Sequence, residues 1–78
     1  MKTMLPEFEV EAFIDALFPG GWKQTEIARI LDVDRNTIAR WLKDGMPVPK
    51  ARELVAYRIM ETIRENAKLA AIMDEYKI

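Results

Sequence analysis

Residues 24–43 read QTEIARILDVDRNTIARWLK, and the main architecture of the chain can be predicted from them. Apolar residues recur at helical spacing in both halves of it. The pattern predicts one helix that starts near residue 23 or 24, a turn at Asp32-Val33 and a second helix over 34–43. Asp34 can cap the second helix by accepting a hydrogen bond from a backbone amide two or three residues further on. Asp44-Gly45 then ends that helix.

The packing of these two helices can be anticipated from the sizes of their side chains. Ala28 is the small residue that lets the second helix approach the first closely. Leu31, Val33 and Ile38 supply the apolar contacts that fix the crossing, and Trp41 anchors the end of the second helix. The opposite side of the second helix is then exposed and consists of Asp34, Arg35, Asn36, Ala39, Arg40 and Lys43.

The stretch resembles the helix-turn-helix of the phage repressor and Cro-type family. The residues on that family's motif positions are Gln24, Ala28, Leu31, Val33 and Ile38. A looser similarity to short phage and plasmid regulators covers residues 22–58, including the run from Trp41 to Pro49 and the following helix with Leu54. The family usually has glycine in the turn, where this chain has Asp32. Aspartate tolerates the left-handed conformation better than most residues, so the turn is still expected.

The resemblance implies roles for exposed residues of the stretch. Arg35, Asn36 and Arg40 occupy positions that contact base edges, and arginine and asparagine suit guanine and adenine respectively. Gln24 stands where the family holds a phosphate, and the further candidates for phosphate or backbone contact are Lys23, Thr25, Thr37 and Lys43, of which Thr37 could instead contact a base. The alternative is that the arginines form an ordinary solvated face. Lys50, Arg52 and Arg58 are equally open between phosphate contact and plain surface.

The segments on either side predict further helices. Pro6 opens a helix over about 7–18, which Pro19-Gly20-Gly21 stops, and Trp22 fills the core after that break. Residues 46–49 (Met-Pro-Val-Pro) predict an extended connector. The span 49–76 has no proline or glycine after its first residue and predicts one long helix or two nearly collinear ones. Part of this span should either fold back or project toward a partner.

The C-terminal span carries an apolar stripe whose early part should close the core. Its late part, from about residue 60, has more apolar surface than a minimal domain needs. We expect a dimer interface there, built from Ile63, Leu69, Ile72, Met73 and Tyr76. The alternative is that the stripe packs within the chain.

Composition bounds the class of protein. The chain of 78 residues predicts a single, compact all-α domain (1–78) of four to five helices. Cysteine and histidine are both absent, so we expect no enzyme, no metal site and no cofactor. The net charge is −1, but residues 23–58 carry +3 against −3 for residues 1–22. Charged residues interrupt every apolar run that could be a signal peptide or membrane span, which predicts a cytoplasmic protein.

The sequence thus predicts a sequence-specific double-stranded DNA-binding transcriptional regulator. The resemblance favours a phage, prophage or plasmid repressor that binds an operator through the major groove, as a homodimer and without a small-molecule ligand. The alternative is a protein-interaction or assembly module with the same shape. An antitoxin, or the DNA-recognition part of a packaging or replication complex, would fit that description.

Overall fold

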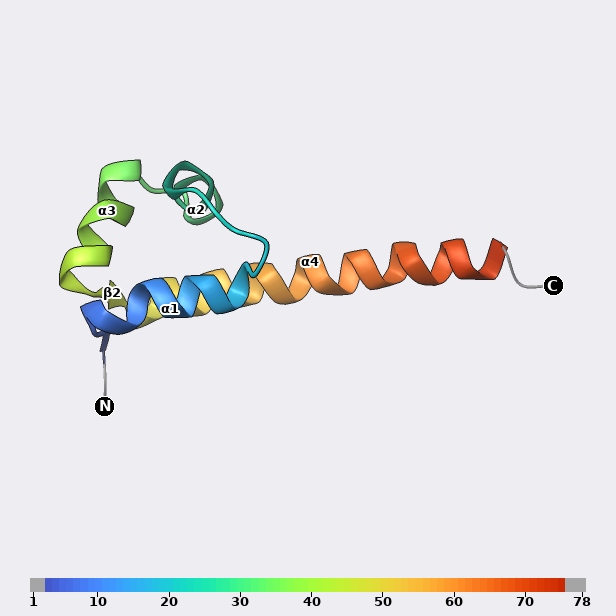
Figure 1. Ribbon diagram of the computed structural model, residues 1–78, viewed down its shortest axis with the longest axis horizontal. Coiled ribbons are helices and arrows are strands. Elements are labelled where there is room, and N and C mark those ends of the chain that lie inside the picture. The colour runs from blue at the N-terminus through green and yellow to red at the C-terminus, as the bar shows by residue number, and fades with distance from the viewer. Residues whose placement is uncertain (1–2, 76–78) are drawn as a thin grey trace.

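The computed structural model describes residues 3–75 and has four helices and one small sheet. The order along the chain is β1 (Met4–Leu5), α1 (Glu7–Leu17), α2 (Gln24–Leu31), α3 (Arg35–Asp44), β2 (Met46–Pro47) and α4 (Val48–Glu75). The first three helices gather at one end, and α4 runs out of this head as a long rod (Figure 1). The predicted all-α class, with a long C-terminal helix, is confirmed.

The boundaries of the short helices follow local signals in the sequence. Pro6 is the N-cap of α1, as its missing amide proton allows. Asp32 follows α2 in the left-handed conformation, with φ 56° and ψ 49°. The Asp34 carboxylate accepts a hydrogen bond of 2.9 Å from the backbone amide of Asn36 and so caps α3. The predicted turn and the predicted cap are therefore both confirmed.

The core of the head draws on every helix. Its buried residues are Val10 and Ile14 of α1, Ile27, Ala28 and Leu31 of α2, Ile38 of α3, Met46 of β2, and Ala51 and Leu54 of α4. Trp22 and Trp41 are half-buried against this cluster, and the Trp22 indole N–H donates to the Asp15 carboxylate at 2.6 Å. Both tryptophans thus pack against the core as predicted, but they lie at its rim and do not fill its centre.

The small sheet was not predicted. Leu5 pairs with Met46 and Met4 pairs with Pro47 in antiparallel register. The prediction of an extended connector over residues 46–49 is wrong in its second half, because α4 already begins at Val48. A proline is tolerated within the first turn of a helix, where its missing amide proton costs no hydrogen bond, and this accommodates Pro49. Met46 itself is fully buried (0% exposed), so the connector contributes to the core.

The C-terminal span forms one continuous helix of 28 residues. Ala51 and Leu54 are buried in the head, whereas every described residue from Thr62 onward is exposed. The rod accounts for the longest dimension of the molecule, 54 Å against 28 and 19 Å for the other two. Of the two predicted alternatives, the span projects and does not fold back (Figure 1). None of the helices within residues 3–75 has an apolar run long enough to traverse a bilayer.

Arg58 fastens the start of this rod to the end of α1. Its Nε donates to the carbonyl oxygen of Leu17 at 2.8 Å, and its guanidinium lies over the Phe18 ring, 5.5 Å from the ring centre. The carbonyls at a helix C-terminus lack partners within the helix and attract a positive charge. Arg58 therefore satisfies the end of α1 and holds α4 beside it.

We predict that Arg58→Ala lowers the free energy of unfolding by about 1–2 kcal/mol, since it removes a charged hydrogen bond and a cation–π contact. Urea denaturation followed by circular dichroism measures the change. Arg64→Ala is the matched control, because Arg64 makes only an exposed ion pair with Glu61, and such pairs contribute at most about 1 kcal/mol. Equal losses in the two variants would mean that the contact with Leu17 stabilises nothing.

Candidate nucleic-acid interface

The candidate interface is built on α2, the turn after it and α3. Val33 N–H donates to the Ala28 carbonyl at 2.9 Å, which closes the end of α2 across the left-handed Asp32. Ala28 is buried, as expected for the small residue at the helix crossing. Leu31 and Ile38 are buried nearby and Val33 packs against them, so α2 and α3 are held at a fixed angle by side chains. A rigid pair of helices is what a recognition helix needs for support.

The outer side of α3 presents the residues predicted to contact bases. Arg35, Asn36 and Arg40 are all exposed. Asn36 and Arg40 stand four residues apart and therefore share a face of the helix. Within the described span 3–75, neither arginine takes part in an ion pair. The structure thus leaves all three side chains of α3 open to solvent, and neither arginine is paired with a carboxylate of the described residues.

The residues predicted to contact phosphate divide between two helices. Lys23 and Thr25 are exposed and Gln24 is half-buried at the start of α2. That start has no side-chain cap, so the first amides of α2 are left without a side-chain partner. Such amides bind phosphate oxygens readily. In α3, Lys43 is exposed and Thr37 is half-buried.

The three basic residues that the sequence left open differ in their surroundings. Lys50 forms an ion pair of 3.0 Å with Glu53, and Arg58 bonds to Leu17 as described above. Arg52 is exposed on α4 and joins no ion pair among residues 3–75. The structural role of Arg58 depends on a partner 41 residues away in the sequence, and no local pattern could have indicated it.

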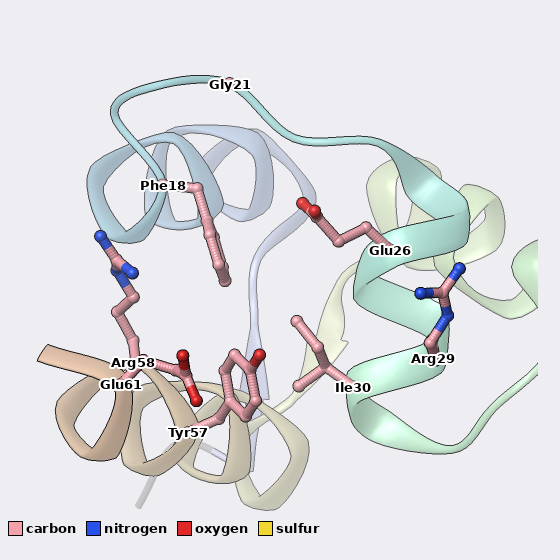
Figure 2. A pocket seen from close by; sticks show the side chains of 8 residues that line it. All are labelled: Phe18, Gly21, Glu26, Arg29, Ile30, Tyr57, Arg58 and Glu61. Atoms are coloured by element: carbon pink, nitrogen blue, oxygen red, sulfur yellow. The ribbon is translucent and has the colours of Figure 1, made fainter. Parts of the chain in front are cut away.

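A hollow of about 320 Å³ lies on another side of the head, between α2, α4 and the loop after α1. Figure 2 shows Tyr57 of α4 and Ile30 of α2 pointing toward one another across it, while Arg58 reaches up toward Phe18. Glu26 and Arg29 of α2 also line the hollow (Figure 2). Glu26 and Arg29 stand three residues apart on α2 but form no ion pair within the described part of the chain.

Comparison with known families identifies the segment that carries this geometry. Residues 14–45 match the family described as a homeodomain-like domain. This segment is thus similar to helix-turn-helix domains. The match runs from the middle of α1 through α2, the turn and α3 to Gly45. No curated protein and no solved structure matches the chain.

The family match bears on the resemblance seen in the sequence. It supports a helix-turn-helix family that binds DNA, so this coarser part of the prediction is confirmed. The phage repressor and Cro type is a finer assignment and stays a prediction. The roles of individual residues in contacting bases or phosphates are likewise predictions.

Proposed function

We propose that the protein is a sequence-specific double-stranded DNA-binding transcriptional regulator that acts in the cytoplasm as a repressor encoded by a phage, prophage or plasmid. In this proposal α3 enters the major groove, and the protein occupies an operator and excludes polymerase. The homodimer positions two such helices on paired half-sites, which lie about 34–36 Å apart.

The observation that carries the proposal is the outer face of α3. Arg35, Asn36 and Arg40 project from a helix that the core holds from behind through Ile38. Arginine and asparagine each offer two hydrogen-bonding groups that match guanine and adenine edges in the major groove. Neither arginine has a carboxylate partner within residues 3–75, so both can bind DNA without breaking an ion pair. The uncapped start of α2 adds a phosphate site beside Lys23 and Thr25.

Selection of bound duplexes from a random DNA pool at about 0.15 M salt tests the proposal, because non-specific binding is weak at that ionic strength. We expect enrichment of a two-fold-symmetric site. An asymmetric half-site would keep the DNA-binding function and remove the dimer. If no sequence is enriched, the regulator is ruled out in favour of the interaction or assembly module, which would use the exposed α4 to bind another protein.

The base-contacting and phosphate-contacting roles can be separated with two substitutions in α3. Arg40→Ala should lose about 1–3 kcal/mol of binding free energy at one base position, whereas Lys43→Ala should weaken binding to all sequences alike. Titration of the selected duplex and of single-base variants of it measures both effects. Uniform weakening by Arg40→Ala would show that Arg40 contacts only the DNA backbone.

A further inference from the structure

The outer part of α4 is exposed on all sides but is not polar on all sides. Every described residue from Thr62 to Glu75 is exposed. Large apolar side chains are nevertheless frequent here, and Ile59, Met60, Ile63, Leu69, Ile72 and Met73 are each more than half exposed. A helix that stayed alone in water would be expected to carry charges around its whole circumference. The exposed apolar residues therefore suggest that one side of α4 is covered by a partner, and their positions around the helix indicate which side.

One side of α4 carries a seam with the spacing of a coiled coil. The seam consists of Ala56, Ile59, Ile63, Asn66, Ala70 and Met73, which alternate at intervals of three and four residues. All six are exposed and none is charged. Steps of three and four average 3.5 residues, which is the period that keeps one side of a helix facing a partner helix.

The residues around the seam strengthen this pattern. The positions directly beside it over 60–69 are Met60, Thr62, Ala67 and Leu69, again without charge. Over residues 58–68 the charged side chains lie on the other side of the rod, where Arg64 pairs with Glu61 at 3.0 Å and Arg58 approaches Glu65 at 3.9 Å. Separation of charged and apolar sides is typical of a helix with a buried face.

The seam faces away from the head of its own chain. Leu54 is fully buried in the head, and Ile63 follows it by nine residues, which is two and a half helical turns. Leu54 and Ile63 therefore point to opposite sides of α4. A partner helix on the seam thus approaches α4 from the side opposite Leu54 and meets the head only at the end of α1, beside Leu17.

We propose that this seam pairs with the seam of a second copy of the chain, as a parallel, in-register two-stranded coiled coil. The inference rests on the homodimer of the proposed function and adds its interface, orientation and register. It does not depend on DNA binding. In an isologous pair, both copies contribute the same surface. The seam can pair with itself in this way because it carries no charge that would repel the same charge on the other copy.

Asn66 decides the orientation. In a parallel, in-register pair, each Asn66 meets Asn66 of the other copy. A carboxamide can both donate a hydrogen bond to a second carboxamide and accept one from it. A single polar residue in such a seam fixes register. In the antiparallel arrangement that pairs the whole seam, Asn66 faces Ile63, which leaves the amide without a partner. That arrangement also brings Glu53 near Asp74 of the other copy, and like charges repel.

A shallow apolar hollow offers a place for the second copy where the seam meets the head. The hollow has a volume of about 200 Å³ and is lined mainly by Leu17, Val55, Ile59 and Ile63. In the parallel register, the helix position opposite Val55 in the second copy is Met60. Methionine is flexible and fills irregular apolar gaps.

Ile72, which the sequence predicts to be in the dimer interface, lies outside the interface proposed here. It follows Ile63 by nine residues and therefore points away from the seam. The two isoleucines are otherwise similar, since Ile63 is 58% exposed and Ile72 is 51% exposed in the same helix. This pair gives a matched test of which side of α4 associates.

Sedimentation equilibrium of the full chain is the first test. We expect a mass of twice the chain's 9.1 kDa for the parent. Ile63→Asp should raise the dissociation constant by about 100-fold or more, because it places carboxylates in an apolar seam, and Ile72→Asp should change it less than about threefold. A monomeric parent, a trimer, or equal effects of the two substitutions would overturn the proposal. Circular dichroism on both variants checks that the head stays folded, because Ile63 lines a hollow that it shares with Leu17 of α1.

A disulfide cross-link tests the orientation, because the chain has no cysteine of its own. In the parallel register the two copies of residue 73 adjoin, so Met73→Cys should cross-link almost completely under mild oxidation, whereas Ile72→Cys should not. The antiparallel register separates the two copies of residue 73 by about 25 Å at 1.5 Å per residue. A dimer that fails to cross-link at position 73 would therefore exclude the parallel arrangement. Both readouts are free of DNA, so they cannot be confused with a failure of DNA binding.

Discussion

Replacement of Leu54 by alanine should lower the free energy of unfolding by about 3–5 kcal/mol. Leu54 is fully buried (0% exposed) in the head, and its truncation leaves a cavity that the surrounding helices can fill only in part. A domain of this size has a marginal core and a total stability of the order of 5 kcal/mol. We therefore expect a large unfolded fraction at 37 °C and a corresponding loss of DNA binding.

Urea denaturation followed by circular dichroism measures this effect. The matched control is Ile72→Ala, which truncates a half-exposed residue of the same helix that lies outside the proposed coiled-coil seam. It should shift the free energy of unfolding by no more than about 0.5 kcal/mol. If the two variants unfold at the same urea concentration, α4 is not docked on the head through Leu54.

The importance of Leu54 concerns the DNA-binding face as well as the fold. Ile38 of α3 and Leu54 of α4 belong to the same buried cluster, with Ile27 of α2. A loss of packing under α4 therefore loosens the support of α3, although α3 itself carries the exposed arginines. Binding would decline for all sequences alike, in contrast to the expected base-specific effect of Arg40→Ala.

The helices were predictable because their signals are local. The helical spacing of apolar residues located α2 and α3. The Asp34 cap and the turn at Asp32 follow from the short-range conformational preferences of aspartate. The exposure of Arg35, Asn36 and Arg40 also agrees with the prediction from the sequence, since the period of a helix determines which side faces water. Their contacts with bases are still predictions.

The features that the sequence could not predict all depend on distant partners. The pairing of Leu5 with Met46 joins residues that are far apart in the sequence. A strand of two residues is also too short to show the alternation of apolar and polar side chains by which strands are predicted. Burial of Met46 follows from this pairing. The hydrogen bond from Arg58 to Leu17 likewise spans the chain. Tyr76, one of the residues predicted to form the dimer interface, lies outside the described residues.

The second large effect is expected from Gly45→Ala. Gly45 ends α3 with φ 107° and ψ 162°, a backbone conformation that is open essentially to glycine alone and costs other residues about 1–3 kcal/mol. A β-carbon at this position would also stand 2.7 Å from the carbonyl oxygen of Leu5. That oxygen belongs to the backbone of β1 and cannot rotate away as a side chain would. Strain and collision together should cost about 3 kcal/mol or more.

Gly20→Ala is the matched control for this substitution. A β-carbon on Gly20 meets no atom within 4 Å, so the free energy of unfolding should change by about 0.5 kcal/mol at most. Urea denaturation of both variants measures the difference. Equal stability of the two would mean that β1 does not cover Gly45 in solution.

Because α3 ends at Gly45, the close approach of β1 fixes the point at which the chain leaves α3 and enters α4. A loss for Gly45→Ala greater than the cost of the backbone conformation alone, which is about 1–3 kcal/mol, would therefore show that the strand pair, which contributes no residue to the DNA-binding face, holds the end of the helix that carries it.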